Sequence, residues 1–192
     1  MSAPDEKSAH PHEDDAVLVK RAQDGDMAAF EELVRRHERP LFSYMYRMCG
    51  NRADAEEITQ AALVRSWQAL GGFRGASSFK TWLFRIGMNL CYNRRTRTKP
   101  TEELDESLAG PQSHEPAEQY EQRVRAQAVQ AGLARLPADQ RSALVLSVYQ
   151  ELSYKEIADA MGKSVRAVDS LLVRAKANLR KALEPARSRG VT

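Results

Sequence analysis

Arginine and serine side chains recur at helical spacing near the C-terminal end of this sequence, and both residue types bind nucleic acid. Arg166, Ser170 and Arg174 are four residues apart, so in a helix they lie on one face, and Val173 shares this side. An arginine guanidinium matches the hydrogen-bonding edge of guanine, and serine or arginine can contact phosphates. The pattern therefore predicts a helix that enters the major groove of DNA.

The helix that carries this face is expected to pack on a shorter helix that precedes it. Ser153 is a candidate N-cap with Glu156 three residues later, which predicts a first helix over residues 154–161. Gly162 supplies the left-handed residue that a tight turn needs, and Ser164 is expected to cap the second helix. The core face of that second helix is predicted to contain Val165, Val168, Leu172, Ala175 and Leu179. We interpret the segment as a helix-turn-helix; the alternative is a helical hairpin whose solvent face happens to carry arginine.

An earlier segment is also basic, and aromatic residues alternate with its charges. Residues 80–99 contain no acidic side chain but have six basic ones: Lys80, Arg85, Arg94, Arg95, Arg97 and Lys99. Apolar residues follow helical spacing, which predicts that most of the aromatic side chains here belong to a core face formed by Phe79, Trp82, Leu83, Ile86 and Leu90.

The flank of that core face and the loop before it are candidates for contact with bases. Arg85 and Asn89 lie beside the apolar face, and asparagine offers both a donor and an acceptor to a base edge. Residues 75–78 combine small side chains with hydroxyl groups. A loop of this composition can hold an unstacked base, as in proteins that bind single strands.

Further helices are expected ahead of this segment. One is predicted to begin at Asp15, and a second is predicted to be capped by Asp26. Pro40 is expected to interrupt the second helix. Asp54 and Glu57 have the spacing of a capping box, which predicts the start of another long helix.

An acidic stretch separates the two basic segments. Seven acidic residues lie between positions 99 and 121, where Lys99 is the single basic residue and prolines recur. We therefore predict an all-α protein with two small helical domains joined by a flexible acidic linker. The expected organisation is a disordered N-terminus at 1–14, a first domain at 15–97, a linker at 98–119, a second domain at 120–186 and a basic tail at 187–192.

Composition argues against several classes of function. The 192 residues are 42% hydrophobic and 7% aromatic, which is typical of an all-α globular protein, and the net charge is only +3. No stretch approaches the roughly 18 apolar residues that span a bilayer, and no signal peptide is seen, so we expect a cytoplasmic protein. Cys49 and Cys91 lack zinc-binding neighbours and are expected to be ordinary thiols. We expect no metal, no cofactor and no enzymatic activity, because no catalytic constellation is present.

Taken together, ordered motifs over nearly the whole chain past residue 15 resemble bacterial sigma factors of the extracytoplasmic-function type, in the sigma-70 family. The motifs of the first domain are Gly25-Asp26-x3-Phe30-x2-Leu33-Val34, Asp54-Ala55-Glu56-Glu57-x2-Gln60 and Phe73-Arg74-Gly75-x2-Ser78-Phe79-x-Thr81-Trp82-Leu83-x-Arg85-Ile86-x2-Asn89. Those of the second are Leu136-Pro137-x3-Arg141 and Leu152-Ser153-Tyr154-x-Glu156-Ile157-Ala158.

The resemblance implies partners and site residues. The first domain is expected to dock on the β′ clamp helices of core RNA polymerase through Asp54, Glu56, Glu57 and Gln60; without the resemblance these would suggest only a solvated helix face. It is also expected to open and hold the −10 element through Ser77, Ser78, Phe79, Lys80, Arg85 and Asn89. The second domain is expected at the β flap and at the −35 element, which it reads with Ser164, Arg166, Asp169, Ser170 and Arg174.

Regulation and the role of the linker are also implied only by resemblance. An anti-sigma factor is the expected inhibitor, and a stress or envelope regulon is the expected target. The acidic linker is either a plain tether or a segment that follows basic surfaces of the polymerase built for nucleic acid.

Asp169 departs from the family pattern, in which many members carry a basic residue at this point. It would repel a phosphate, but it could accept a hydrogen bond from a cytosine amino group or form an ion pair with Arg166 or Arg174.

The runner-up function is a two-domain transcriptional regulator with a ligand-sensing domain, which would account for the helix-turn-helix but not for the segment around Trp82.

Overall fold

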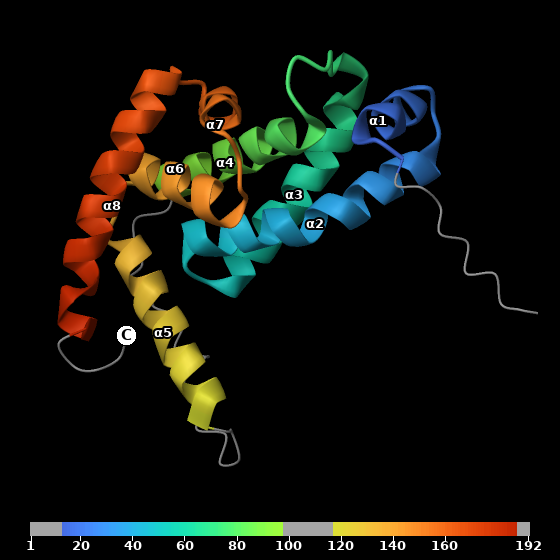
Figure 1. Cartoon of the computed structure of the whole chain (residues 1–192). Helices are drawn as coiled ribbons and strands as arrows, with labels where there is room; N and C mark the ends of the chain where they lie inside the picture. Colours follow the sequence, from blue (N-terminus) through green and yellow to red (C-terminus); the bar gives the residue numbers. More distant parts are fainter. Residues whose placement is uncertain (1–12, 98–116, 188–192) are drawn as a thin grey trace, which may run out of the picture.

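Helices dominate the parts of the chain that the structure, a computed structural model, describes: residues 13–97 and 117–187. The first unit comprises α1 (Asp15–Gln23), α2 (Met27–Cys49), α3 (Arg52–Ala69), the 3₁₀ turn η1 (Leu70–Gly72) and α4 (Phe79–Arg97). The second comprises α5 (Ala117–Ala134), α6 (Ala138–Tyr149), α7 (Tyr154–Met161) and α8 (Val165–Arg187) (Figure 1). The predicted all-α class is confirmed. The proposed linker, the basic tail and the N-terminal segment fall almost entirely outside the described residues.

Helix α2 is the centre of the first unit, because α1, α3 and α4 all pack against it. Its buried side chains include Leu33, Leu41 and Met45. Helix α4 approaches α2 closely at Gly87, where a Cβ atom would lie 3.0 Å from Met45 Cε and 3.1 Å from Leu41 Cδ1. The missing side chain of this glycine therefore sets how near the two helices can come.

Two predicted helix boundaries in this unit were wrong. Helix α3 is capped by Asn51, whose side-chain oxygen accepts a hydrogen bond from the Asp54 backbone N–H at 2.8 Å. Asp54 therefore lies inside the first turn, where its carboxylate accepts from Asn51 Nδ2 at 2.9 Å. Pro40 does not interrupt α2, which continues through it. Buried side chains before and after the proline, His37 and Leu41 among them, pack both halves onto one core and offset the lost backbone hydrogen bond.

The helix-turn-helix prediction is confirmed in its local geometry. Ser153 and Glu156 form a complete capping box at the start of α7, and Gly162 ends that helix in the left-handed region with φ +62°. The Ser164 hydroxyl accepts from the Ala167 N–H at 3.2 Å and so caps α8. One predicted core residue was wrong: Val165, the first residue of α8, is 47% exposed, whereas Val168 and Leu172 further along the helix are buried.

The two units share one continuous core, which the sequence did not indicate. Helix α7 packs on α4, and α5 and α6 pack on α2, so that both α2 and α4 contact the second unit (Figure 1). Phe84, Met88 and Cys91 of α4 are buried, although they lie off the predicted core face. At the centre of the interface, the Tyr44 hydroxyl lies 2.5 Å from Ser142 Oγ, and both side chains are buried.

Polar contacts also join the units at their edges. The Tyr92 hydroxyl of α4 donates to Asp139 of α6 at 2.9 Å, and Lys163 pairs with the other carboxylate oxygen at 3.0 Å. Burial acts to raise the pKa of Asp139, but the hydrogen bonds from Lys163 and Tyr92 outweigh it and hold this pKa below its ordinary value of 3.8. Because the side chain is 45% exposed, we expect the stabilisation to be below about 1 kcal/mol.

This carboxylate predicts a pH dependence of stability. A lowered pKa in the folded state means that Asp139 stabilises the protein above pH 3.8 and that this contribution is lost as the pH falls through the folded-state pKa. We expect Asp139→Asn to unfold at lower urea concentration than the native protein at pH 7, with the difference shrinking towards pH 3. The control Asp159→Asn removes an exposed carboxylate of α7. An Asp139→Asn effect that stays constant from pH 7 to pH 3 would contradict the assignment.

Candidate nucleic-acid interface

The outer face of α8 presents the predicted major-groove residues to solvent. Arg166, Asp169, Ser170 and Arg174 are all exposed, whereas Val168 is buried beneath them. The Arg174 Nε donates to the Ser170 carbonyl at 3.1 Å, which orients the guanidinium along the helix. In the described part of the second unit Asp169 forms no ion pair, so the predicted pairing with Arg166 or Arg174 is not seen.

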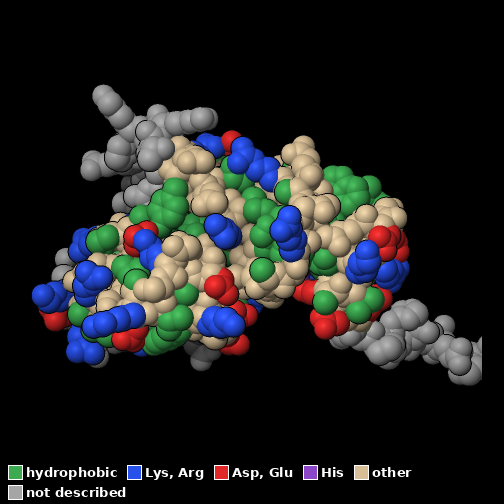
Figure 2. Space-filling model, turned by 90° about the horizontal axis from the view of Figure 1, so that it is seen from above, with side chains coloured by type: hydrophobic (Ala, Val, Ile, Leu, Met, Phe, Trp, Pro, Cys, Tyr) green, Lys and Arg blue, Asp and Glu red, His purple; other side chains and the backbone are tan. Residues whose placement is uncertain are grey.

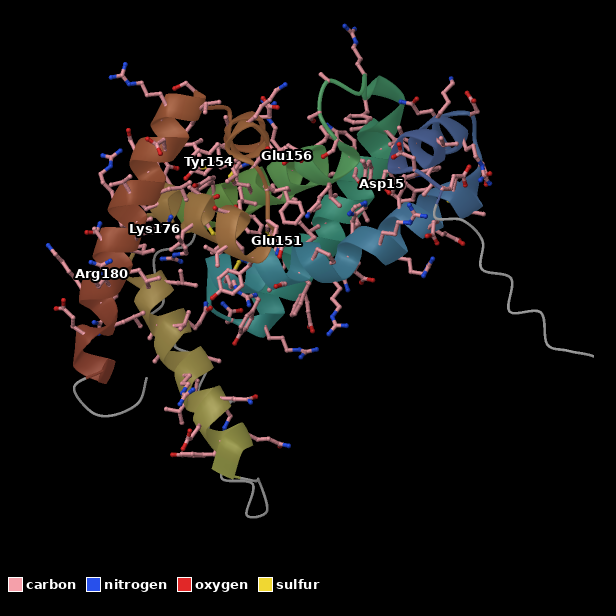
Figure 3. The ribbon with its side chains drawn as sticks, viewed as in Figure 1. Asp15, Glu151, Tyr154, Glu156, Lys176 and Arg180 are labelled. Atoms are coloured by element: carbon pink, nitrogen blue, oxygen red, sulfur yellow. The ribbon has the colours of Figure 1, made fainter. Side chains whose placement is uncertain are left out.

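Basic side chains extend this face along the helix. Lys176 and Arg180 are exposed further along α8 (Figure 3). Lys and Arg side chains also gather over the end of the molecule that α8 forms (Figure 2). A row of basic side chains along a helix can bind the phosphate backbone of DNA. Phosphate contacts depend on the number of cations more than on precise geometry.

The loop before α4 borders a hollow on the first unit. This hollow has a volume of about 520 Å³ and lies between α1 and residues 73–79. Ser77 and Ser78, two of the residues predicted to hold a base, line this hollow, and their contact with DNA stays a prediction. Ser78 also caps α4, because its hydroxyl accepts a hydrogen bond from the Thr81 N–H at 3.1 Å.

Phe79 does not present its ring as a surface for a base. It is only 2% exposed and packs among His37, Phe73 and Trp82. Its prediction as a residue that contacts DNA is not supported by this position, because a core side chain cannot stack on a base without unfolding. Phe73 is half-buried and lines the same hollow, with its ring centroid 4.7 Å from that of Trp82. In the sequence Phe73 stood out only as the first residue of a family motif, with no predicted contact to DNA.

The remaining predicted −10 residues of α4 do not share this hollow. Asn89 is exposed and lies in a separate groove of about 440 Å³ between α3 and α4, together with Arg65 and Gln68. Sequence reasoning missed Arg65 and Gln68, because only the packing of α3 on α4 brings them beside Asn89. Arg85 is exposed on α4. Lys80 points to the second unit, where its ammonium donates to the Gln150 carbonyl at 2.8 Å.

The predicted polymerase-binding residues fall on two sides of α3. Asp54 and Glu57 both pair at 2.6 Å with Arg94 of α4, which raises the pKa of that guanidinium, chiefly through the hydrogen bond with Glu57. Glu56 pairs with Arg52 at 2.7 Å and, with Gln60, borders a groove of about 330 Å³ that faces α2. Asp54 and Glu57 therefore face Arg94 of α4, whereas Glu56 and Gln60 border the groove beside α2.

The two cysteines lie on neighbouring helices, with their Sγ atoms 3.8 Å apart. Cys91 is buried and Cys49 is half-buried. The hydrogen bond with Cys91, together with burial, raises the pKa of the Cys49 thiol above its ordinary value. A thiol with a raised pKa is a poor nucleophile at neutral pH, which agrees with the interpretation of both as ordinary thiols.

Comparisons with known proteins match both units. The family model for Sigma-70 region 2 matches residues 33–101, and the model for Sigma-70 region 4 matches residues 126–179. The RNA polymerase sigma-H factor of Pseudomonas aeruginosa is 34% identical, with 90% of this chain and 95% of that protein covered. The ECF RNA polymerase sigma-E factor of Escherichia coli K12 is 31% identical, with coverages of 89% and 95%.

A solved structure shows the same arrangement of helices. CnrH, in its complex with the cytosolic domain of CnrY, is 28% identical and superposes with a TM-score of 0.68 over 89% of this chain and 97% of that one. Two helical units with these matches define the class, which is that of the transcription-initiation factors of bacterial RNA polymerase. The chain belongs to the sigma-70 family, in its extracytoplasmic-function group. Within the residues described here, no helix is both long and apolar enough to cross a membrane.

Proposed function

We propose that this sigma factor reads the −35 element with the outer face of α8 and the −10 element with the loop at residues 73–78 and the groove beside Asn89. The exposed row of Arg166, Asp169, Ser170 and Arg174 above a buried Val168 carries the proposal, because it presents hydrogen-bonding side chains to solvent at the capped start of a long helix. The chemistry of nucleotide addition belongs to the polymerase, so the chain itself is not an enzyme. Its place of action is the cytoplasm, where polymerase and promoter meet.

Contact with core polymerase is assigned to α3. Glu56 and Gln60 offer one exposed polar edge for the β′ clamp helices, and Asp54 and Glu57 become available when Arg94 releases them. The second unit would rest on the β flap. An anti-sigma factor is the proposed regulator, which is supported by the likeness to CnrH, whose structure was solved with a CnrY domain.

The two units pack too closely to contact both promoter elements at the same time. Elements centred at −10 and −35 are 25 base pairs apart, or about 85 Å along B-form DNA. Helices α4 and α7 are in direct contact, and Lys80 is bonded to the loop ahead of α7. Simultaneous contact with both elements therefore requires the two units to separate, and we propose that binding to core polymerase stabilises the separated form.

One transcription experiment tests the proposal. The chain is mixed with bacterial core polymerase and a library of promoter duplexes, and the run-off transcripts are sequenced. We expect initiation from templates that share a −35 and a −10 motif. A folded chain that binds core polymerase but initiates from no template, or from all templates equally, would refute the assignment of the two reading surfaces.

Asp169 provides a test of base reading on α8. Arginine at this position should attract phosphates and remove an acceptor for a cytosine amino group. We expect Asp169→Arg to raise affinity for unrelated duplex DNA by about tenfold and to change the preferred −35 sequence in the same selection. Asp159→Arg, on an exposed position of α7, is the charge-matched control. An unchanged −35 preference in Asp169→Arg would exclude a reading role for this carboxylate.

A further inference from the structure

A glutamine at the end of α1 bonds to both ends of the turn that leads into the −10 loop. The Gln23 Nε2 donates to the carbonyl of Leu70 at 2.9 Å and to the carbonyl of Phe73 at 2.8 Å. A side-chain amide has two hydrogens on its nitrogen, so both donors are used. The Leu70 carbonyl also accepts from the Phe73 N–H at 3.0 Å, so one side chain reinforces the whole 3₁₀ turn from 47 residues away in the sequence.

The loop that follows is held mainly at its two ends. In the described structure the one hydrogen bond from residues 74–77 is a long contact of 3.4 Å between the Ser77 hydroxyl and the Ser78 carbonyl. Gly75 takes a positive φ of 70°, and Arg74 and Gly75 are exposed. Ser78 fixes the far end by capping α4. The near end depends on Phe73, and the bond from Gln23 holds the backbone of Phe73.

The position of Phe73 matters because its ring lines the hollow of about 520 Å³. Gln23 and Lys20 of α1 form the opposite wall. Stacking on an aromatic ring stabilises an unpaired base, and this contribution is lost when the ring turns away. A carbonyl held in place at Phe73 therefore fixes the orientation of the surface on which a base can stack.

We propose that Gln23 is a positioning residue for −10 recognition: it holds the Phe73 end of the loop so that the hollow between α1 and residues 73–79 keeps the shape that accepts one unpaired base. The inference rests on the proposed function of that loop. It also extends the reading surface to α1, which lies ahead of residues 33–101, the part matched by the family model for region 2. Asp15, at the other end of α1, lies 2.6 Å from His37 Nε2 and anchors the helix there.

Three substitutions separate the hydrogen bonds from the packing of the side chain. Gln23→Met keeps the length and removes both donors, and Gln23→Glu sets a carboxylate oxygen against two carbonyl oxygens. Gln23→Lys restores donors on a side chain that is one bond longer and flexible enough to bend back to both carbonyls. The measured quantity is the discrimination ratio, which is initiation from the preferred promoter divided by initiation from the same duplex with one −10 base replaced. Gln122→Met, at an exposed position of α5, is the matched control.

We expect the discrimination ratio to fall about tenfold in Gln23→Met and in Gln23→Glu, because both hydrogen bonds that hold the Phe73 end of the loop are lost. Gln23→Lys should keep most of the native discrimination ratio. Affinity for core polymerase and discrimination at the −35 element should stay native in all three, whereas general destabilisation would lower every readout together. Native discrimination in both Gln23→Met and Gln23→Glu would overturn the role of Gln23 and leave the proposed function intact. A native chain that initiates without any −10 preference would overturn both.

Discussion

Replacing Arg141 with alanine is expected to lower the free energy of unfolding by about 3–5 kcal/mol, because three backbone carbonyls lose their shared donor. The buried guanidinium donates to the carbonyl of Met48 at 2.8 Å, of Ala134 at 2.6 Å and of Leu136 at 3.2 Å. Met48 lies at the end of α2 and Ala134 at the end of α5, where carbonyls lack partners within their own helices. Arg141 therefore joins the two units and closes the turn into α6. Urea unfolding monitored by circular dichroism measures the change.

The matched control is Arg135→Ala, which removes an exposed arginine from the same turn. It should change stability by less than about 0.5 kcal/mol. Arg141→Lys should fall between the two, because one ammonium cannot reproduce the forked geometry of a guanidinium. Equal unfolding midpoints for Arg141→Ala and Arg135→Ala would show that the three bonds are replaced by water at no cost. Arg141 belongs to the family motif Leu136-Pro137-x3-Arg141, and its three hydrogen bonds to backbone carbonyls explain why an arginine stands at this position.

The double substitution Arg166→Ala with Arg174→Ala is expected to reduce initiation about 100-fold at promoters that carry the preferred −35 element. Each arginine that reads a guanine contributes about 1–3 kcal/mol of discrimination, and 1.4 kcal/mol corresponds to tenfold. Both side chains are exposed near the capped start of α8, so their loss should leave the fold unchanged. The measurement is run-off transcription on that promoter and on one with a scrambled −35 element.

On the scrambled promoter the same double variant should lose far less, because only phosphate contacts remain to be removed. Lys176→Ala with Arg180→Ala takes the same charge from positions further along α8 (Figure 3). That control should weaken initiation modestly and by a similar factor on both promoters. An equal loss on both promoters for Arg166→Ala with Arg174→Ala would mean that these arginines supply charge and do not read bases.

Local features of this protein could be predicted from the sequence, because their causes lie within a few residues of one another. The capping box at Ser153 and Glu156, the left-handed Gly162 and the cap at Ser164 each depend on a contact spanning at most three or four positions. The solvent face of α8 followed from helical periodicity in the same way. Asn51 was missed as the cap of α3 because Asp54 and Glu57 offered the same spacing three residues later, and local patterns alone do not choose between two such starts.

The candidate site could be predicted only in part, since periodicity does not say which helix lies beside which. Arg65 and Gln68 join Asn89 only because α3 packs on α4, and Arg94 pairs with Asp54 and Glu57 across the same contact. Phe79 was assigned to DNA by motif, yet it is buried by side chains from α2 and from the loop.

The sequence by itself determined that two helical units would form, where the helix-turn-helix begins, and which side of α8 faces solvent. Hydrogen bonds and periodicity within single elements are sufficient for that. Only the tertiary structure decided that the units share a core through Tyr44 and Ser142, that Lys80 is bonded to the second unit, and that Gln23 is bonded to the carbonyls of Leu70 and Phe73. These contacts join residues 47 to 98 positions apart, so their geometry arises from the packing of helices and not from any local pattern.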